Sequence, residues 1–168
     1  MSLLELFFDP TTVALKICGV TSHYDANQLV EMGVDALGVN FWPQSKRYLA
    51  PDKARWLSEI AGKILRVGVF VNQNPEIPLQ LVRDGYLDVV QLHGDESPED
   101  VTVFSAAKVP FIKAIGVKTI ADLQRAADFG ATAILLDAHA PGIYGGTGER
   151  IDEHAELSIG KWHLIFAE

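Results

Sequence analysis

Three residues suited to proton transfer each stand at the end of a short apolar run. They are Cys18, the only cysteine, at the end of Val13–Cys18; His93, after Leu87–Leu92; and Asp137, after Ala133–Leu136. A thiolate can remove a proton from carbon, and a carboxyl group can donate one to oxygen. Cys18 and Asp137 therefore predict a general base and a general acid, provided that the fold brings them to the same site.

Each of the three also has an ordinary structural explanation. Free cysteine is often a small buried hydrophobe, an aspartate can cap a turn, and a histidine can be a hydrogen-bonded structural residue. Cys18, however, is followed by Gly19 and a helix start, where backbone N–H groups and the helix dipole favour a thiolate. Lys16 lies on the same side of the strand as Cys18. At the mouth of a barrel, partial desolvation would raise the pKa of Asp137 and let it act as an acid near neutrality.

Two loop segments have the composition of substrate-binding loops. Ser45–Tyr48 combines two cations with an aromatic ring; it reads either as a solvated charge run or as a binding loop in which Arg47 grips a carboxylate. Gly142–Gly148 is glycine-rich, so its N–H groups could approach a phosphate, with a plain flexible loop as the alternative. Its spacing matches neither a P-loop nor a dinucleotide fingerprint.

The composition indicates one globular domain that does not bind nucleic acid. The 168 residues are 48% hydrophobic, and a formal net charge of −8 gives no basic field for a phosphate backbone. No apolar run approaches the length of a membrane helix. A single cysteine excludes an internal disulfide and predicts the cytoplasm, and no Cys/His cluster has the spacing of a metal site.

Seven short apolar runs, several rich in Val and Ile, read as buried parallel strands. They are Val13–Cys18, Ala36–Phe41, Leu65–Val71, Leu87–Leu92, Phe111–Ile115, Thr132–Leu136 and Trp162–Ala167. Helical spacing between them predicts helices such as Tyr24–Met32 and Ile120–Phe129. The first would be capped by Thr21 or Ser22 and ended by Gly33, and the second capped by Thr119 and ended by Gly130.

Strands that alternate with helices and end in polar residues predict an α/β fold of the TIM (β/α)8-barrel type, with the site at the carboxyl ends. Seven strands leave the barrel incomplete, so strands one and seven would have open edges through which copies of the chain could associate. We assign residues 13–168 to one barrel domain, truncated after strand seven, and residues 1–12 to an N-terminal extension. Within it, Leu3–Phe8 predicts a strand beside strand one, a short helix plugging the barrel floor, or a frayed terminus.

The order and spacing of seven motifs between about Leu15 and Glu149 resemble phosphoribosylanthranilate isomerase. The motifs are Lys16–Gly19, Ser45–Tyr48, Val67–Asn72, Gln91–Gly94, Lys113–Ala114, Leu135–Asp137 and Gly145–Gly148. The resemblance implies a cofactor-free TIM barrel of tryptophan biosynthesis that converts a sugar phosphate, N-(5-phosphoribosyl)anthranilate, by an Amadori rearrangement. Cys18 would be the general base and Asp137 the general acid. Arg47, His93, Gly145 and Gly146 would contact the substrate.

The sequence departs from the family pattern at its carboxyl end. Family members continue through an eighth strand and two glycine loops that bind the substrate phosphate, whereas here Glu168 stands where a glycine is expected. Remote phosphate binding helps to position the reacting end, so we expect reduced activity. The alternatives are a catalytically silent or partner-completed barrel fragment and another sugar-phosphate isomerase or epimerase on the same fold.

Overall fold

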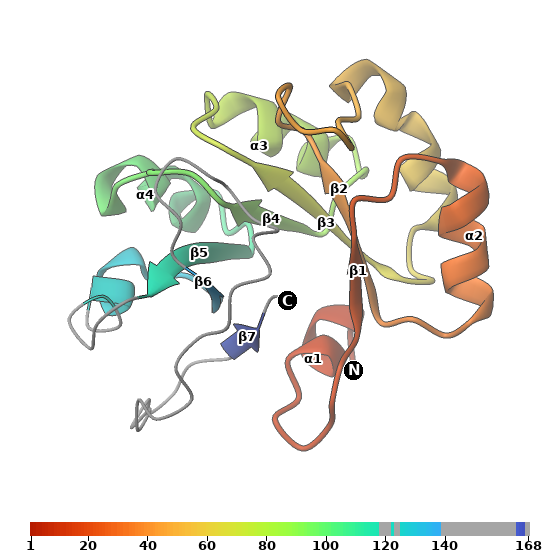
Figure 1. Cartoon of the computed structure of the whole chain (residues 1–168), viewed down its shortest axis with the longest axis horizontal. Coiled ribbons are helices and arrows are strands. Elements are labelled where there is room, and N and C mark those ends of the chain that lie inside the picture. Colours follow the sequence, from red (N-terminus) through yellow and green to blue (C-terminus); the bar gives the residue numbers. More distant parts are fainter. Residues whose placement is uncertain (118–121, 123–124, 139–163, 167–168) are drawn as a thin grey trace.

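The computed structural model describes residues 1–117, 122, 125–138 and 164–166, which form an α/β fold around one curled parallel sheet (Figure 1). Each strand pairs in parallel with the next one along the chain. The strands are β1 (Lys16–Cys18), β2 (Ala36–Asn40), β3 (Leu65–Phe70), β4 (Val89–Leu92), β5 (Phe111–Val117), β6 (Ala133–Ala138) and β7 (Leu164–Phe166). Over the described residues, the predicted α/β fold with a curled, incomplete parallel sheet of the TIM-barrel type is confirmed.

The strand boundaries differ from the predicted ones by one to three residues, and the differences in β1 and β6 bear on the site. β1 begins at Lys16 rather than Val13, because its pairing with β2 starts with Lys16 opposite Ala36. β6 runs on to Ala138, because its register with β5 continues past Leu136. Asp137 is therefore part of a paired strand, and its backbone position is set by the sheet rather than by a turn.

Helices follow most of the strands and cover the outer face of the sheet (Figure 1). They are α2 (His23–Glu31), the 3-10 helix η1 (Pro51–Ile60), α3 (Glu76–Arg83), α4 (Pro98–Ala106) and the 3-10 turn η2 (Ala127–Phe129). A further helix, α1 (Leu3–Phe7), precedes β1. The predicted cap Ser22 is confirmed, since its hydroxyl accepts from Asp25 N at 3.1 Å. Gly33 and Gly130, the predicted helix ends, have the φ values of +72° and +59° that suit glycine. Thr119 lies outside the described residues.

The start of α4 is capped reciprocally by Ser97 and Asp100. The Ser97 hydroxyl accepts from Asp100 N, and the Asp100 carboxylate accepts from the backbone N–H and the hydroxyl of Ser97. These hydrogen bonds stabilise the charged carboxylate and lower the pKa of Asp100 from its ordinary value.

Alternation along the strands divides the apolar residues between two cores. Outward-facing residues such as Leu37, Phe70 and Phe111 pack with the helices, and inward-facing residues such as Val67 and Ile112 fill the inside of the curl. Both sets are almost fully buried. This alternation also decides which polar residues face the inside of the barrel near the carboxyl ends of the strands.

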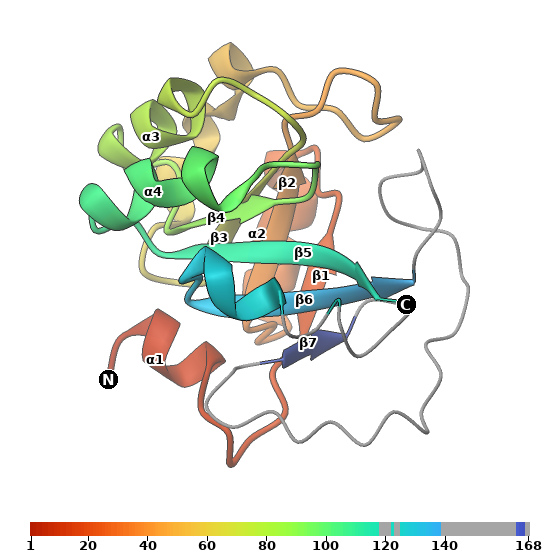
Figure 2. The ribbon, with the colours of Figure 1, turned by 90° about the vertical axis from the view of Figure 1, so that its left-hand side faces the viewer.

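Helix α1 closes the amino-terminal end of the inner core (Figure 2). Phe7 and Phe8 are 8% and 9% exposed, and they pack with Leu65, Ala133 and other inward-facing residues. Burying each ring stabilises the fold by about 1.5–3 kcal/mol. Of the predictions for Leu3–Phe8, the plug helix is confirmed and the strand beside strand one is wrong.

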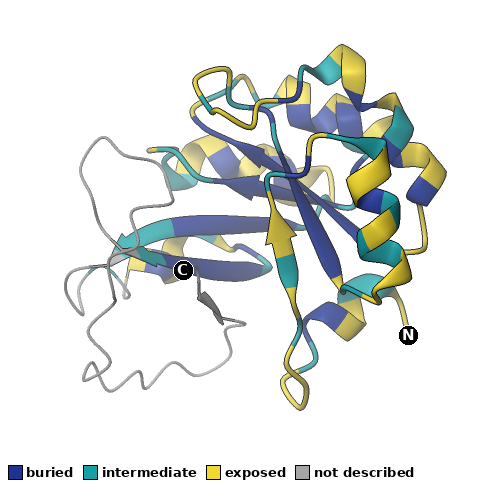
Figure 3. Ribbon diagram, turned by 45° about the vertical axis from the view of Figure 1, so that its right-hand side comes forward, coloured by how far each residue is buried: buried dark blue, intermediate teal, exposed yellow. Residues whose placement is uncertain are grey.

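Strand β1 forms one end of the described sheet and is far more exposed than the strands that follow it (Figure 3). Val13, Leu15 and Ile17 expose 100%, 53% and 37% of their surface, whereas all but the last residue of β2 is buried. Exposed apolar side chains thus lie in and directly before β1, the strand at this end of the sheet.

Candidate active site

The carboxyl ends of the strands carry the polar inward-facing residues of the sheet. The register pairs Cys18 of β1 with Gly38 of β2, and Asp137 of β6 with Gly116 of β5. His93 directly follows β4. The structure therefore brings Cys18, His93 and Asp137 to the same end of the curl, as the sequence predicts.

Cys18 is exposed at the open side of this end, so the alternative of a buried hydrophobe is wrong. A Cβ placed on Gly38 would lie 3.0 Å from Cys18 Sγ and 3.2 Å from Lys16 Nζ. The absence of a side chain at Gly38 thus leaves room beside it for both the thiol and the ammonium. The sequence predicts that backbone N–H groups after Cys18 stabilise a thiolate. This prediction is wrong for the next two residues, since Gly19 N and Val20 N both donate to Gly38 O.

Arg47 reaches back from the loop after β2 to the end of β1. Its Nη1 donates to Cys18 O at 2.7 Å, and its guanidinium lies directly against the backbone of Gly19. Gly19 has φ +86°, a conformation that L side chains rarely adopt. The loop containing Arg47, predicted to bind a carboxylate, is therefore anchored beside Cys18, although the two residues are 29 positions apart.

We expect Gly19→Ala to displace Arg47 and to lower activity more than stability. The methyl group would overlap the guanidinium, and the left-handed backbone would cost about 1–2 kcal/mol. Gly33→Ala is the matched control, because Gly33 has φ +72° with no atom within 4 Å of its added Cβ. Urea unfolding should show similar losses for both variants, and steady-state kinetics should show a raised KM for Gly19→Ala alone. Equal KM values in the two variants would contradict a role for the Arg47 position.

His93 joins Asp137 to Gln91 in a chain of hydrogen bonds. His93 Nε2 lies 2.9 Å from Asp137 Oδ2, and His93 Nδ1 lies 3.1 Å from Gln91 Nε2. The side chains of His93 and Asp137 are each 14% exposed, so their contact is largely shielded from water. Of the two explanations of His93, the structure shows a hydrogen-bonded residue whose partner is the predicted general acid.

The loop that carries His93 is held by a buried ion pair. Lys113 Nζ lies 2.9 Å from Glu96 Oε2, and their side chains are 4% and 10% exposed. Glu96 also accepts from the backbone N–H groups of Asn72 and Gly94, which ties together the loops after β3 and β4. These contacts connect the backbone next to His93 to β3 and β5.

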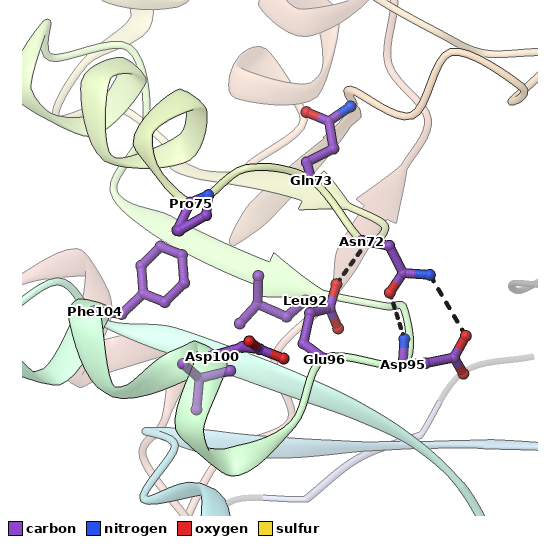
Figure 4. A pocket seen from close by; sticks show the side chains of 9 residues that line it. Asn72, Gln73, Pro75, Leu92, Asp95, Glu96, Asp100 and Phe104 are labelled. Carbon is purple, nitrogen blue, oxygen red and sulfur yellow. Dashed lines mark hydrogen bonds between the residues drawn. The ribbon is translucent and has the colours of Figure 1, made fainter.

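A separate cavity of about 260 Å³ lies on the outer side of these loops (Figure 4). Leu92, Phe104 and Pro75 supply its apolar wall, and Asn72 bonds both Asp95 and Glu96 along its rim. None of the predicted catalytic residues lines this cavity. The candidate site at the strand ends therefore does not coincide with this cavity.

Gly145 and Gly146, together with the whole predicted Gly142–Gly148 loop, lie outside the described residues. Among the residues that the structure does describe, no group of three His, Cys, Asp or Glu side chains is placed to hold a metal ion. In the same ranges, no helix is long and apolar enough to cross a membrane.

Sequence reasoning did not assign roles to Gln91, Gly38 or the Lys113–Glu96 pair. For Gln91 a signal was present, because it lies two residues before His93 and therefore faces the same side of the strand. The other two depend on contacts between strands that are distant in sequence, and no local pattern marks them.

A curled parallel sheet with acid/base side chains at the carboxyl ends of its strands defines an α/β protein of the TIM-barrel class. Residues 15–163 match the family model of N-(5′-phosphoribosyl)anthranilate isomerase. The chain belongs to this family.

Individual relatives agree with the family match. The isomerase of Thermotoga maritima is 44% identical over 141 residues, which are 83% of this chain and 68% of the relative. That of Trichlorobacter lovleyi is 39% identical over 155 residues, 91% of this chain and 74% of the relative. A crystal structure of the Thermotoga maritima enzyme has a TM-score of 0.70 at 42% identity, covering 80% of this chain and 66% of the other. This chain thus spans about two thirds of the length of these relatives.

A second solved isomerase structure contains a bound compound. It is the complex with reduced 1-(o-carboxyphenylamino)-1-deoxyribulose 5-phosphate, with a TM-score of 0.68 at 43% identity, covering 76% of this chain and 66% of the other. That relative binds a molecule with both a carboxylate and a phosphate.

Proposed function

We propose that this chain catalyses the Amadori rearrangement of N-(5-phosphoribosyl)anthranilate to 1-(2-carboxyphenylamino)-1-deoxyribulose 5-phosphate, a reaction of tryptophan biosynthesis, without a cofactor. The observation that carries the proposal is the placement of Cys18 and the His93–Asp137 pair at one end of the curl in a chain of this family. The reaction needs one acid and one base, and these residues supply both.

The two proposed steps follow from the chemistry of the side chains. Asp137 donates its proton to the ribose ring oxygen, the C1–O bond breaks, and a protonated Schiff base forms between C1 and the anthranilate nitrogen. The Cys18 thiolate then takes the C2 proton, and the C2–H electron pair forms the C1–C2 double bond of a neutral enolamine. The enolamine ketonises without further help from the protein.

Substrate contacts complete the proposal. Arg47 holds the anthranilate carboxylate, because its anchoring to Cys18 O through Nη1 leaves the other side of its fork for an anion. Gly145 and Gly146, which lie outside the described residues, are proposed as substrate contacts on the basis of the family resemblance alone. A lone free cysteine suits a reducing compartment, which favours the cytoplasm.

The test is the loss of N-(5-phosphoribosyl)anthranilate fluorescence with purified chain and substrate generated in situ. Turnover that disappears in Cys18→Ala supports the proposal. A folded wild-type chain without turnover would contradict it and would favour the silent-fragment alternative.

We also propose that copies of the chain associate through the outer edge of β1. The exposed Val13, Leu15 and Ile17 support this, because proteins normally cover or pair such edges. Light scattering after size exclusion should show a dimer in the wild type and a shift towards monomer in Leu15→Lys. Met32→Lys is the control, since Met32 is also an exposed apolar residue, 76% exposed, but stands at the end of α2 and not in or beside β1 in the sequence. A wild type that stays monomeric at all concentrations would contradict the association.

A further inference from the structure

Gln91 is a buried amide on the inner face of the sheet, and its neighbours in the adjacent strands are apolar. It is 2% exposed in β4, and its register neighbours on β3 and β5 are Val69 and Ile112. Its Nε2 faces His93 Nδ1 at 3.1 Å, whereas its buried Oε1 has no hydrogen-bond partner among the described residues. An apolar side chain would fill this space without leaving an unpaired oxygen, so packing alone does not explain a glutamine here.

The orientation of this amide determines where hydrogen lies on His93. An amide nitrogen can only donate, so His93 Nδ1 must accept and carry no proton. A neutral imidazole then carries its hydrogen on Nε2, the atom 2.9 Å from Asp137 Oδ2. Asp137 Oδ2 therefore accepts a hydrogen bond from His93, and its Oδ1 is left to carry a proton.

We propose that Gln91 is a positioning residue that directs the exchangeable proton of the His93–Asp137 pair onto Asp137. This proposal rests on the proposed function, in which Asp137 is the proton donor. When the pair binds one more proton, Nδ1 is already occupied by the Gln91 N–H, so the proton goes to Asp137 Oδ1. After Asp137 gives this proton to the ring oxygen, the carboxylate keeps the hydrogen bond from Nε2–H, and the imidazole stays neutral throughout.

The opposite orientation of the Gln91 amide would leave Asp137 without a proton to donate. Oε1 would accept from Nδ1–H, the imidazole would hold the extra proton as a cation, and Asp137 would remain a carboxylate with nothing to donate. Gln91→Glu imposes that state, because a carboxylate of the same shape can only accept from Nδ1–H at neutral pH. In Gln91→Met the side chain can neither donate a hydrogen bond to His93 Nδ1 nor accept one from it, and its volume is nearly the same.

The experiment is nitrogen-15 NMR of the histidine side chains in the wild type, Gln91→Glu and Gln91→Met, with His93 assigned by the signal lost in His93→Asn. The expected wild-type spectrum shows protonated Nε2 and bare Nδ1, and Gln91→Glu should show Nδ1 protonated. A wild-type His93 protonated on Nδ1, or an unchanged His93 pattern in Gln91→Glu, would overturn the proposal. Gln91→Met should lose the single fixed tautomer while its thermal melt stays cooperative, which separates tautomer control from folding.

Kinetics give the second readout. Both variants should lose kcat by about 10²-fold, the lower end of a general-acid contribution, with KM within a factor of about two. A Gln91→Glu variant that moves the proton and keeps full kcat would overturn the positioning role. If the wild type has no turnover at all, the proposed function fails, and the NMR result still decides whether Gln91 controls the tautomer.

Discussion

Replacing Asp137 with asparagine is expected to lower kcat by about 10²- to 10⁴-fold without unfolding the protein. The amide has the shape of the carboxylate, and its oxygen can still accept from His93 Nε2, so the 2.9 Å contact persists. The amide has no proton acidic enough to transfer to the ribose ring oxygen, and opening of the ring then depends on water. Initial rates of fluorescence loss at saturating substrate measure kcat, and a thermal melt checks the fold.

Asp52→Asn makes the same chemical change at the start of η1, where the Asp52 side chain is 73% exposed. It should keep the wild-type kcat. If Asp137→Asn keeps kcat within about threefold of the wild type, Asp137 is not the general acid.

The largest expected loss of stability comes from Lys113→Met. Removing the ammonium leaves Glu96 charged at 10% exposure, facing a methyl group, and breaking one side of a buried pair costs about 3–5 kcal/mol. The backbone donors Asn72 N and Gly94 N still solvate Glu96 in part, so the protein should fold. Urea unfolding followed by circular dichroism gives the free energy of unfolding.

Lys53→Met is the matched control, because Lys53 and Asp52 form a 3.7 Å pair whose side chains are both 73% exposed. Its free energy of unfolding should change by less than about 0.5 kcal/mol. Adding Glu96→Gln to Lys113→Met should recover part of the loss, since the double variant has no unpaired buried charge. A loss below about 1 kcal/mol in Lys113→Met would show that this pair does not hold the two loops.

The sequence by itself determined the class of fold and the position of most elements to within a few residues. Buried parallel strands appear as short apolar runs, and helix caps such as Ser22 and stops such as Gly33 act within three or four residues. The same apolar runs showed that Cys18, His93 and Asp137 stand at strand ends. These residues were expected to meet, because the carboxyl ends of parallel strands lie along the same edge of a sheet.

The tertiary structure decided which side chains touch. The contacts of Arg47 with Cys18, of His93 with Asp137 and of Lys113 with Glu96 join residues 29, 44 and 17 positions apart. Such contacts depend on strand register and on the curl of the sheet, and a change of one residue in register would turn each side chain to the opposite face. No local pattern records either quantity. The tertiary structure was therefore needed to show that His93 contacts Asp137, the candidate general acid, and that the Gln91 amide contacts His93.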